Sequence, residues 1–177
     1  TVSGKRVESG QQVIYHPQRM KIRMLVAASA WHAQLLKASE AGMSNTITPG
    51  MNGTSETTVT EAMLASTVGS GKVSVFSTAM MVAWMEGTAV DVVQPSLEDG
   101  QTTVGTGISV SHVAATPQGM KVRFTAEVTA VSPNGKGLSF KVAAYDETGL
   151  IGEGTHERVI VNKDKFESRT CLLYTSP

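Results

Sequence analysis

The sequence predicts an α+β fold in which an antiparallel sheet wraps around one long buried helix. Two patterns indicate this fold. Residues 79–93 form the most apolar stretch of the 177-residue chain, and a single glutamate, Glu86, interrupts it. From residue 108 onward, apolar and polar residues alternate in successive segments, as in strands that are covered on one face only. The apolar stretch is the only predicted element large enough to cover such a sheet.

The elements before the long helix follow from local composition. Residues 53–60 are rich in β-branched side chains and predict a strand. Thr58 and Glu61 have the spacing of a capping box, which predicts a short helix over residues 61–66. Glycines 69 and 71 then indicate a loop.

The long helix has clear signals at both ends. Ser77 or Thr78 can cap its first turn, and Pro95 must end it because proline cannot continue a helix. Its apolar residues surround the axis instead of forming one stripe, so we expect the helix to be buried on most sides.

Four strands follow the helix. Ile108, Val110 and His112 share one face of the first, and each later strand also has one apolar face. One strand, one buried helix and four wrapped strands are the element order of a hotdog fold. The four predicted segments are residues 108–114, 121–130, 138–144 and 151–161.

Composition restricts the class of protein. The net charge is zero, which gives no sign of a nucleic-acid or anionic-membrane partner. A single cysteine, Cys171, excludes an internal disulfide and fits a reducing compartment, so we expect a cytoplasmic protein. No apolar run approaches the length that spans a membrane.

The two ends of the sequence differ from the rest. Lys and Arg outnumber Asp and Glu by six to two in residues 1–42, and we interpret this stretch as a disordered or non-native leader before Met43. Residues 169–177 fit no periodic pattern and are interpreted as a non-native tail. The predicted domain therefore covers residues 43–168.

Glu86 and His112 are the two polar residues that stand out among apolar neighbours. A carboxylate within an apolar helix is unusual unless it is paired or functional. It can act as a general base or as a nucleophile, and the sequence does not distinguish the two. His112 faces the helix in the predicted fold, which makes it the expected partner of Glu86, able to orient water or a leaving group.

Four segments in order, residues 68–71, 76–86, 103–117 and 154–161, resemble the hotdog thioesterases related to fluoroacetyl-CoA thioesterase. The resemblance covers about residues 50 to 168. It implies hydrolysis of acyl-CoA thioesters. The fluoroacetyl-specific member has a phenylalanine lid near the position of Lys72, so the same acyl preference is not expected.

The resemblance also implies a set of site residues. Thr78, Glu86 and His112 match the catalytic group of the family, and Gly105 matches the glycine near the substrate carbonyl. Phe76, at the start of the same helix motif, is a second candidate for substrate binding. Thr78 is also a natural helix cap, and the first turn of a helix is suited to an oxyanion.

Spacing along the helix bears on the assembly. Eight helical residues separate Thr78 from Glu86 by about 12 Å. One small reaction centre does not easily touch both, and hotdog relatives place their sites at subunit interfaces, so we expect a homodimer with shared sites. His156 lies on a mixed strand face and is expected to be structural; His16 and His32 lie in the leader.

The leading hypothesis is hydrolysis of a small acyl-CoA thioester to the free acid and CoA, with no cofactor and no metal site. The alternative is a non-catalytic acyl-CoA-binding hotdog domain, which would bind CoA esters without turnover. A hydratase is disfavoured because the Asp/His pair expected near the start of its helix is not found. The identity of the acyl group stays open.

Overall fold

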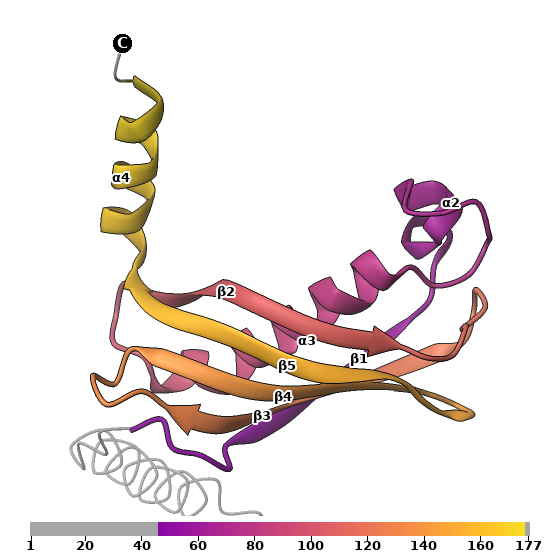
Figure 1. Ribbon diagram of the computed structural model, residues 1–177, viewed down its shortest axis with the longest axis horizontal. Coiled ribbons are helices and arrows are strands. Elements are labelled where there is room, and N and C mark those ends of the chain that lie inside the picture. The colour runs from indigo at the N-terminus through magenta and orange to yellow at the C-terminus, as the bar shows by residue number, and fades with distance from the viewer. Residues whose placement is uncertain (1–45, 176–177) are drawn as a thin grey trace, which may run out of the picture. The chain divides into compact units, whose positions relative to one another are not determined.

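The computed structural model describes residues 46–175 (Figure 1). The predicted leader, residues 1–42, lies outside this part of the chain. The described elements, in chain order, are β1 (Asn52–Thr58), the 3-10 helix η1 (Glu61–Met63), α2 (Ala65–Val68), α3 (Thr78–Val93), the 3-10 helix η2 (Gln94–Ser96), β2 (Gln101–His112), β3 (Lys121–Val131), β4 (Gly137–Asp146), β5 (Gly149–Asn162) and α4 (Lys163–Thr175).

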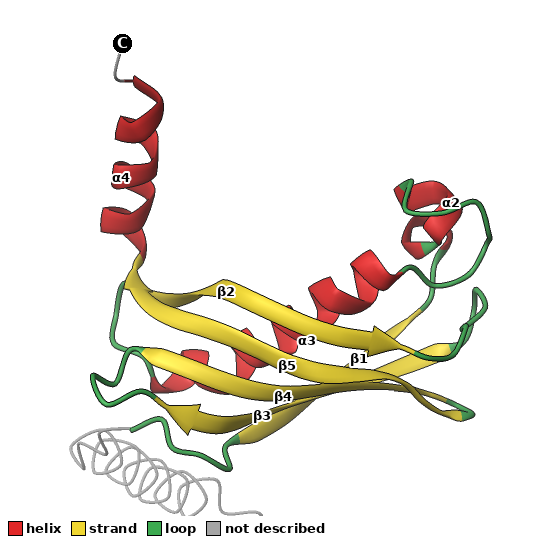
Figure 2. Ribbon diagram, viewed as in Figure 1, coloured by secondary structure: helices red, strands yellow, loops and turns green. Residues whose placement is uncertain are grey.

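The strands form one five-stranded antiparallel sheet in the order β1-β3-β4-β5-β2. Figure 2 shows α3 crossing one face of this sheet. The strands β3, β4 and β5 follow one another as hairpins in the middle, which leaves β1 and β2 at the two edges. The predicted α+β fold, a sheet curved around one long helix, is confirmed.

The core lies between α3 and the sheet. Met81, Met85 and Ala89 are fully buried on one face of the helix, where they meet Phe124 and Phe140 of the sheet. The helix begins after Ser77, whose side-chain oxygen accepts the backbone N–H of Met80, so one of the two predicted caps is the one used.

The expectation that α3 is buried on most sides is wrong for the single chain. Ala83, Gly87 and Asp91 are exposed on the face that points away from the sheet. One sheet can cover only one side of a helix, so the remaining apolar surface needs another partner if it is to be covered.

The predicted capping box is also absent. Thr58 belongs to β1, and Thr60 precedes η1 without capping it through its side chain. The predicted helix over residues 61–66 is instead a 3-10 turn followed by α2, with Leu64 between them bridged to Phe76. Tertiary pairing thus replaces the local cap.

The edge strand β2 is longer than predicted and contains an irregularity. Gly105 pairs with Arg158 and Gly107 pairs with Glu157, so Thr106 is an extra residue in β2. A bulge of one residue changes which side chains face inward. As a result, Gly105 and His112, seven residues apart, both face α3.

The C-terminal helix α4 continues past residue 168, where the predicted domain ends. The interpretation of residues 169–177 as a non-native tail stays a prediction. In the described part of the chain, no helix combines the length and the apolar character needed to cross a membrane.

Candidate active site

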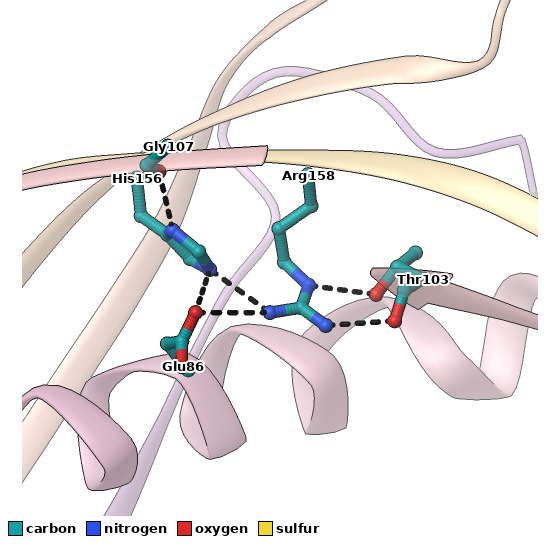
Figure 3. Close-up of polar contacts among 5 residues, drawn as sticks. All are labelled: Glu86, Thr103, Gly107, His156 and Arg158. Carbon is teal, nitrogen blue, oxygen red and sulfur yellow. Dashed lines mark hydrogen bonds and ion pairs between the residues drawn. The ribbon is translucent and has the colours of Figure 1, made fainter. Parts of the chain in front are cut away.

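Glu86 lies on the side of α3 that faces β2 and β5, with 40% of its side chain exposed. Its carboxylate oxygen Oε1 is 3.6 Å from His156 Nε2 and 3.9 Å from Arg158 Nη1 (Figure 3). Both distances are longer than hydrogen bonds, so the carboxylate is held by charge and by packing. The expected pairing of Glu86 with His112 is not found within the chain.

Arg158 is fixed by a set of hydrogen bonds on the inner face of β5. Its Nε donates to Thr103 Oγ1 at 2.8 Å, and its Nη2 donates to the Thr103 carbonyl at 2.7 Å. Its Nη1 lies 2.9 Å from His156 Nε2. Arg158 is only 7% exposed, so a positive charge sits almost buried beside Glu86.

His156 is fully buried and bonded at both ring nitrogens. Its Nδ1 lies 2.8 Å from the carbonyl oxygen of Gly107. A carbonyl oxygen only accepts, so Nδ1 carries the proton in this arrangement, and Nε2 accepts from Arg158. Burial lowers the pKa of His156, and so does the charge of Arg158, although the Gly107 carbonyl, Glu86 and Glu157 act in the opposite direction. The neutral ring is therefore favoured.

Gly105 faces the Glu86 carboxylate from β2. A Cβ atom on Gly105 would lie 2.7 Å from Glu86 Oε1 and 3.2 Å from His156 Cε1, both too close for an undisturbed contact. The missing side chain thus makes room for the carboxylate itself. That Gly105 also admits an acyl group stays a prediction.

Thr78 and His112 form a second polar group at the start of α3. Thr78 Oγ1 lies 2.9 Å from His112 Nδ1. The other ring nitrogen, Nε2, is buried and has no hydrogen-bond partner among the residues that the structure describes. Burial lowers the pKa of His112, and the backbone of Ala114 partly opposes this shift. The neutral form of His112 is therefore favoured, and its Nε2 is left for a further contact.

A pocket of about 360 Å³ opens beside this second group. Thr78 and His112 line it together with Phe76 and the loop over residues 70–75. Phe76 is 1% exposed and packs against Phe124 with 6.4 Å between ring centroids, so most of its surface belongs to the core. That Phe76 also contacts the substrate stays a prediction.

The predicted site residues therefore fall into two groups within one chain. Thr78 is next to His112, and Glu86 is next to Gly105; about 12 Å of helix separates the groups. The structure adds Arg158, which was not predicted. The sequence signal for Arg158 was a charged residue at an inward-facing position of a strand, two residues after His156 and on the same face. Among residues 46–175, no three His, Cys, Asp or Glu side chains are grouped to hold a metal ion.

All the residues of the two polar groups lie within a segment that matches a known protein family. A family model described as fluoroacetyl-CoA-specific thioesterase matches residues 59–164, from the residue after β1 into α4. The chain belongs to this thioesterase family. The predicted class of enzyme is thereby confirmed.

Individual members of the family, and the fold, agree with this assignment. The fluoroacetyl-CoA thioesterase of Streptantibioticus cattleyicolor is 44% identical over 95 residues, which are 54% of this chain and 67% of that protein. A variant of the fluoroacetyl-CoA-specific thioesterase, solved in complex with fluoroacetate and CoA, is 36% identical, covers 68% of this chain and 99% of its own, and has a TM-score of 0.64. A hot-dog-like protein from Thermanaerovibrio acidaminovorans shares the fold, with 24% identity, 77% of this chain and 99% of that chain covered, and a TM-score of 0.68.

Proposed function

We propose that the protein hydrolyses a small acyl-CoA thioester to the free acid and CoA, using Glu86 as the reactive carboxylate. The observation that carries this proposal is the setting of Glu86. Its half-exposed carboxylate faces a glycine on one side and the nearly buried guanidinium of Arg158 on the other. A charged carboxylate kept in place at an open position is suited to act on a substrate.

Glu86, Thr78 and His112 each take one part in the proposed reaction. As a general base, Glu86 takes a proton from water while the water oxygen bonds to the thioester carbon. Thr78 and the free backbone N–H groups of the first turn of α3 hold the oxyanion, and His112 orients the water or the departing sulfur. When the C–S bond breaks, the thiolate of CoA takes this proton from Glu86. As a nucleophile, Glu86 would instead bond to the carbonyl carbon while the C–S bond breaks and the CoA thiolate leaves; water would then cleave the resulting anhydride to the free acid and the Glu86 carboxylate. The reaction as proposed needs no cofactor.

We further propose that the active unit is a homodimer, joined along β2, with each site shared between subunits. The strand β2 is an edge strand with one side unpaired among the described strands. In an antiparallel pair about a two-fold axis, paired residue numbers have a constant sum. A two-fold axis at Ser109 pairs residues that face the same side, and because Thr106 is an extra residue the sum falls by one beyond it, which sets Gly105 opposite the partner's His112. This pairing would bring the two separated groups together.

The exposed side of α3 supports the same assembly. Ala83 is exposed and Val90 is half-buried on the side of the helix next to Glu86. A second subunit paired along β2 would bring its own helix toward this surface. The apolar residues that surround the axis of α3 would then be covered by two different layers.

Release of thiol from a panel of acyl-CoA esters of increasing length tests the activity with the full chain. We expect turnover of short acyl groups, and a loss of rate when the acyl group no longer fits beside Thr78. Saturable binding of the esters without thiol release would favour the non-catalytic alternative. The absence of both binding and release would reject the proposal.

Mixing two inactive variants tests the shared site. If each site takes Glu86 from one subunit and His112 from the other, a heterodimer of Glu86→Gln with His112→Ala contains one intact site and one doubly damaged site. Random exchange of subunits should then restore about one quarter of wild-type turnover. Each variant alone should remain inactive.

The same mixture identifies the opposite arrangement. If Glu86 and His112 of the same subunit served one site, every site in the mixture would carry one damaged residue, and no activity would return. Size-exclusion chromatography with light scattering checks that subunits associate. We propose a cytoplasmic location as well, supported by the use of a single cysteine.

A further inference from the structure

His156 is a buried histidine that the proposed reaction does not use. It is fully buried in β5, and its ring packs against Phe140 with 6.3 Å between centroids. Both of its nitrogens are engaged, one by the backbone of β2 and the other by Arg158. Any buried polar nitrogen needs a hydrogen-bond partner, so what distinguishes His156 is that one of its two partners is the arginine beside Glu86.

The contact with Gly107 determines what the other nitrogen can do. With the proton on Nδ1, directed at the Gly107 carbonyl, Nε2 has only a lone pair. The bulge at Thr106 brings that carbonyl to the ring, since it adds a residue between the pairs formed by Gly105 and Gly107. The irregular edge of the sheet therefore selects the tautomer that accepts from Arg158.

Arg158 in turn has one nitrogen near Glu86. Thr103 holds Nε and Nη2 at one edge of the guanidinium, and His156 holds Nη1. Nη1 is also the atom that lies 3.9 Å from Glu86 Oε1. Without an acceptor at His156, this end of the guanidinium loses a fixed contact, and the carboxylate loses its nearest oriented positive charge.

We propose that His156 is a positioning residue that acts through Arg158 on Glu86: its Nε2 accepts from Arg158 Nη1 and thereby holds the guanidinium where it places the carboxylate beside Gly105. The inference rests on the proposed role of Glu86. His156 has the same role whether Glu86 is a general base or a nucleophile, because both reactions need the carboxylate in one position.

Two isosteric substitutions separate the two contacts of His156. The amide nitrogen of Asn occupies the place of Nδ1, so His156→Asn keeps a donor for Gly107 and removes the acceptor for Arg158. The amide of Gln reaches the place of Nε2, so His156→Gln keeps an acceptor for Arg158 and removes the donor for Gly107. We expect His156→Gln to retain kcat within about threefold and His156→Asn to lose about 10- to 100-fold, with KM nearly unchanged in both.

A double-mutant cycle shows whether the effect passes through the carboxylate. In the Glu86→Gln background, adding His156→Asn should cost almost nothing further in kcat. A full additional loss would overturn the proposal, as would equal kcat values for the Asn and Gln variants. Thermal unfolding of each variant identifies any that fail to fold.

A measurement without turnover keeps this inference separate from the proposed function. In the NMR spectrum of wild-type protein and of His156→Gln, the two Nη1 protons of Arg158 should be resolved, because rotation about the bond from Cζ to a held Nη1 is slow. In His156→Asn they should average. If wild type released no thiol from any acyl-CoA but showed this contrast, the proposed function would fail and the positioning would stand; averaged signals in wild type would overturn the positioning.

Discussion

Replacing Glu86 with Gln is expected to lower kcat by about 10²- to 10⁴-fold, the range observed when a general acid or base is removed. The amide has nearly the same shape as the carboxylate but neither the charge nor the basicity. It can neither take a proton from water nor attack a thioester. Since the side chain is 40% exposed and forms no part of the core, the fold should persist. Thiol release at saturating acyl-CoA measures the effect.

Asp91→Asn is the matched control for this substitution. Asp91 is a carboxylate on the same helix, exposed on the face away from the sheet. The same chemical change there should leave kcat within about twofold, as expected for a surface substitution away from the site. Equal losses in both variants would show that charge on α3, not the position of Glu86, is what matters. Wild-type kcat in Glu86→Gln would remove Glu86 from the mechanism.

Replacing Gly105 with Ala is the second large effect that we expect, with kcat/KM lowered by about 10²-fold. The added methyl group would lie 2.7 Å from Glu86 Oε1, so the carboxylate must move. The end of a flexible side chain can move at little cost in stability. The buried ring of His156, with Cε1 3.2 Å from the added methyl group, must shift slightly, so the thermal unfolding midpoint should fall by a small amount while the carboxylate leaves its place beside Arg158.

The two interpretations of Gly105 predict different results in a variant that already lacks the carboxylate. If the glycine makes room for Glu86, adding Gly105→Ala to Glu86→Gln should cause little further loss. If the glycine makes room for the acyl group, the second substitution should raise KM and lower the remaining rate in that background as well. Kinetics of the two single variants and the double variant distinguish these outcomes.

Much of the fold followed from local patterns. The helix α3 begins directly after Ser77 and ends before Pro95, because a hydroxyl cap and a proline act on their immediate neighbours. The alternation that predicted β3 and β4 reflects burial of one face of each strand, which also depends on the sequence only locally. The capping box at Thr58 was wrong because pairing with β3 places this threonine in a strand.

The candidate site was predicted only in part. Glu86 and His112 were conspicuous because polar residues among apolar ones need an explanation, but their partners were not visible. His112 meets Thr78, and Glu86 meets His156 and Arg158. Each of these contacts joins residues that are distant in the sequence. Spacing along the helix did correctly separate Thr78 from Glu86.

Sequence alone was therefore sufficient for the first strand, the long helix and the four later strands, their order, the thioesterase resemblance and the identity of Glu86 as an unusual carboxylate. Those features depend on periodicity and on residue type, which act over a few positions. The setting of Glu86 depends instead on strand register. A single extra residue, Thr106, turns Gly105 and His112 toward the same side of β2 and presents the Gly107 carbonyl to His156. Such a shift appears only once β2 and β5 are paired, because a bulge is a mismatch between two strands and not a property of one.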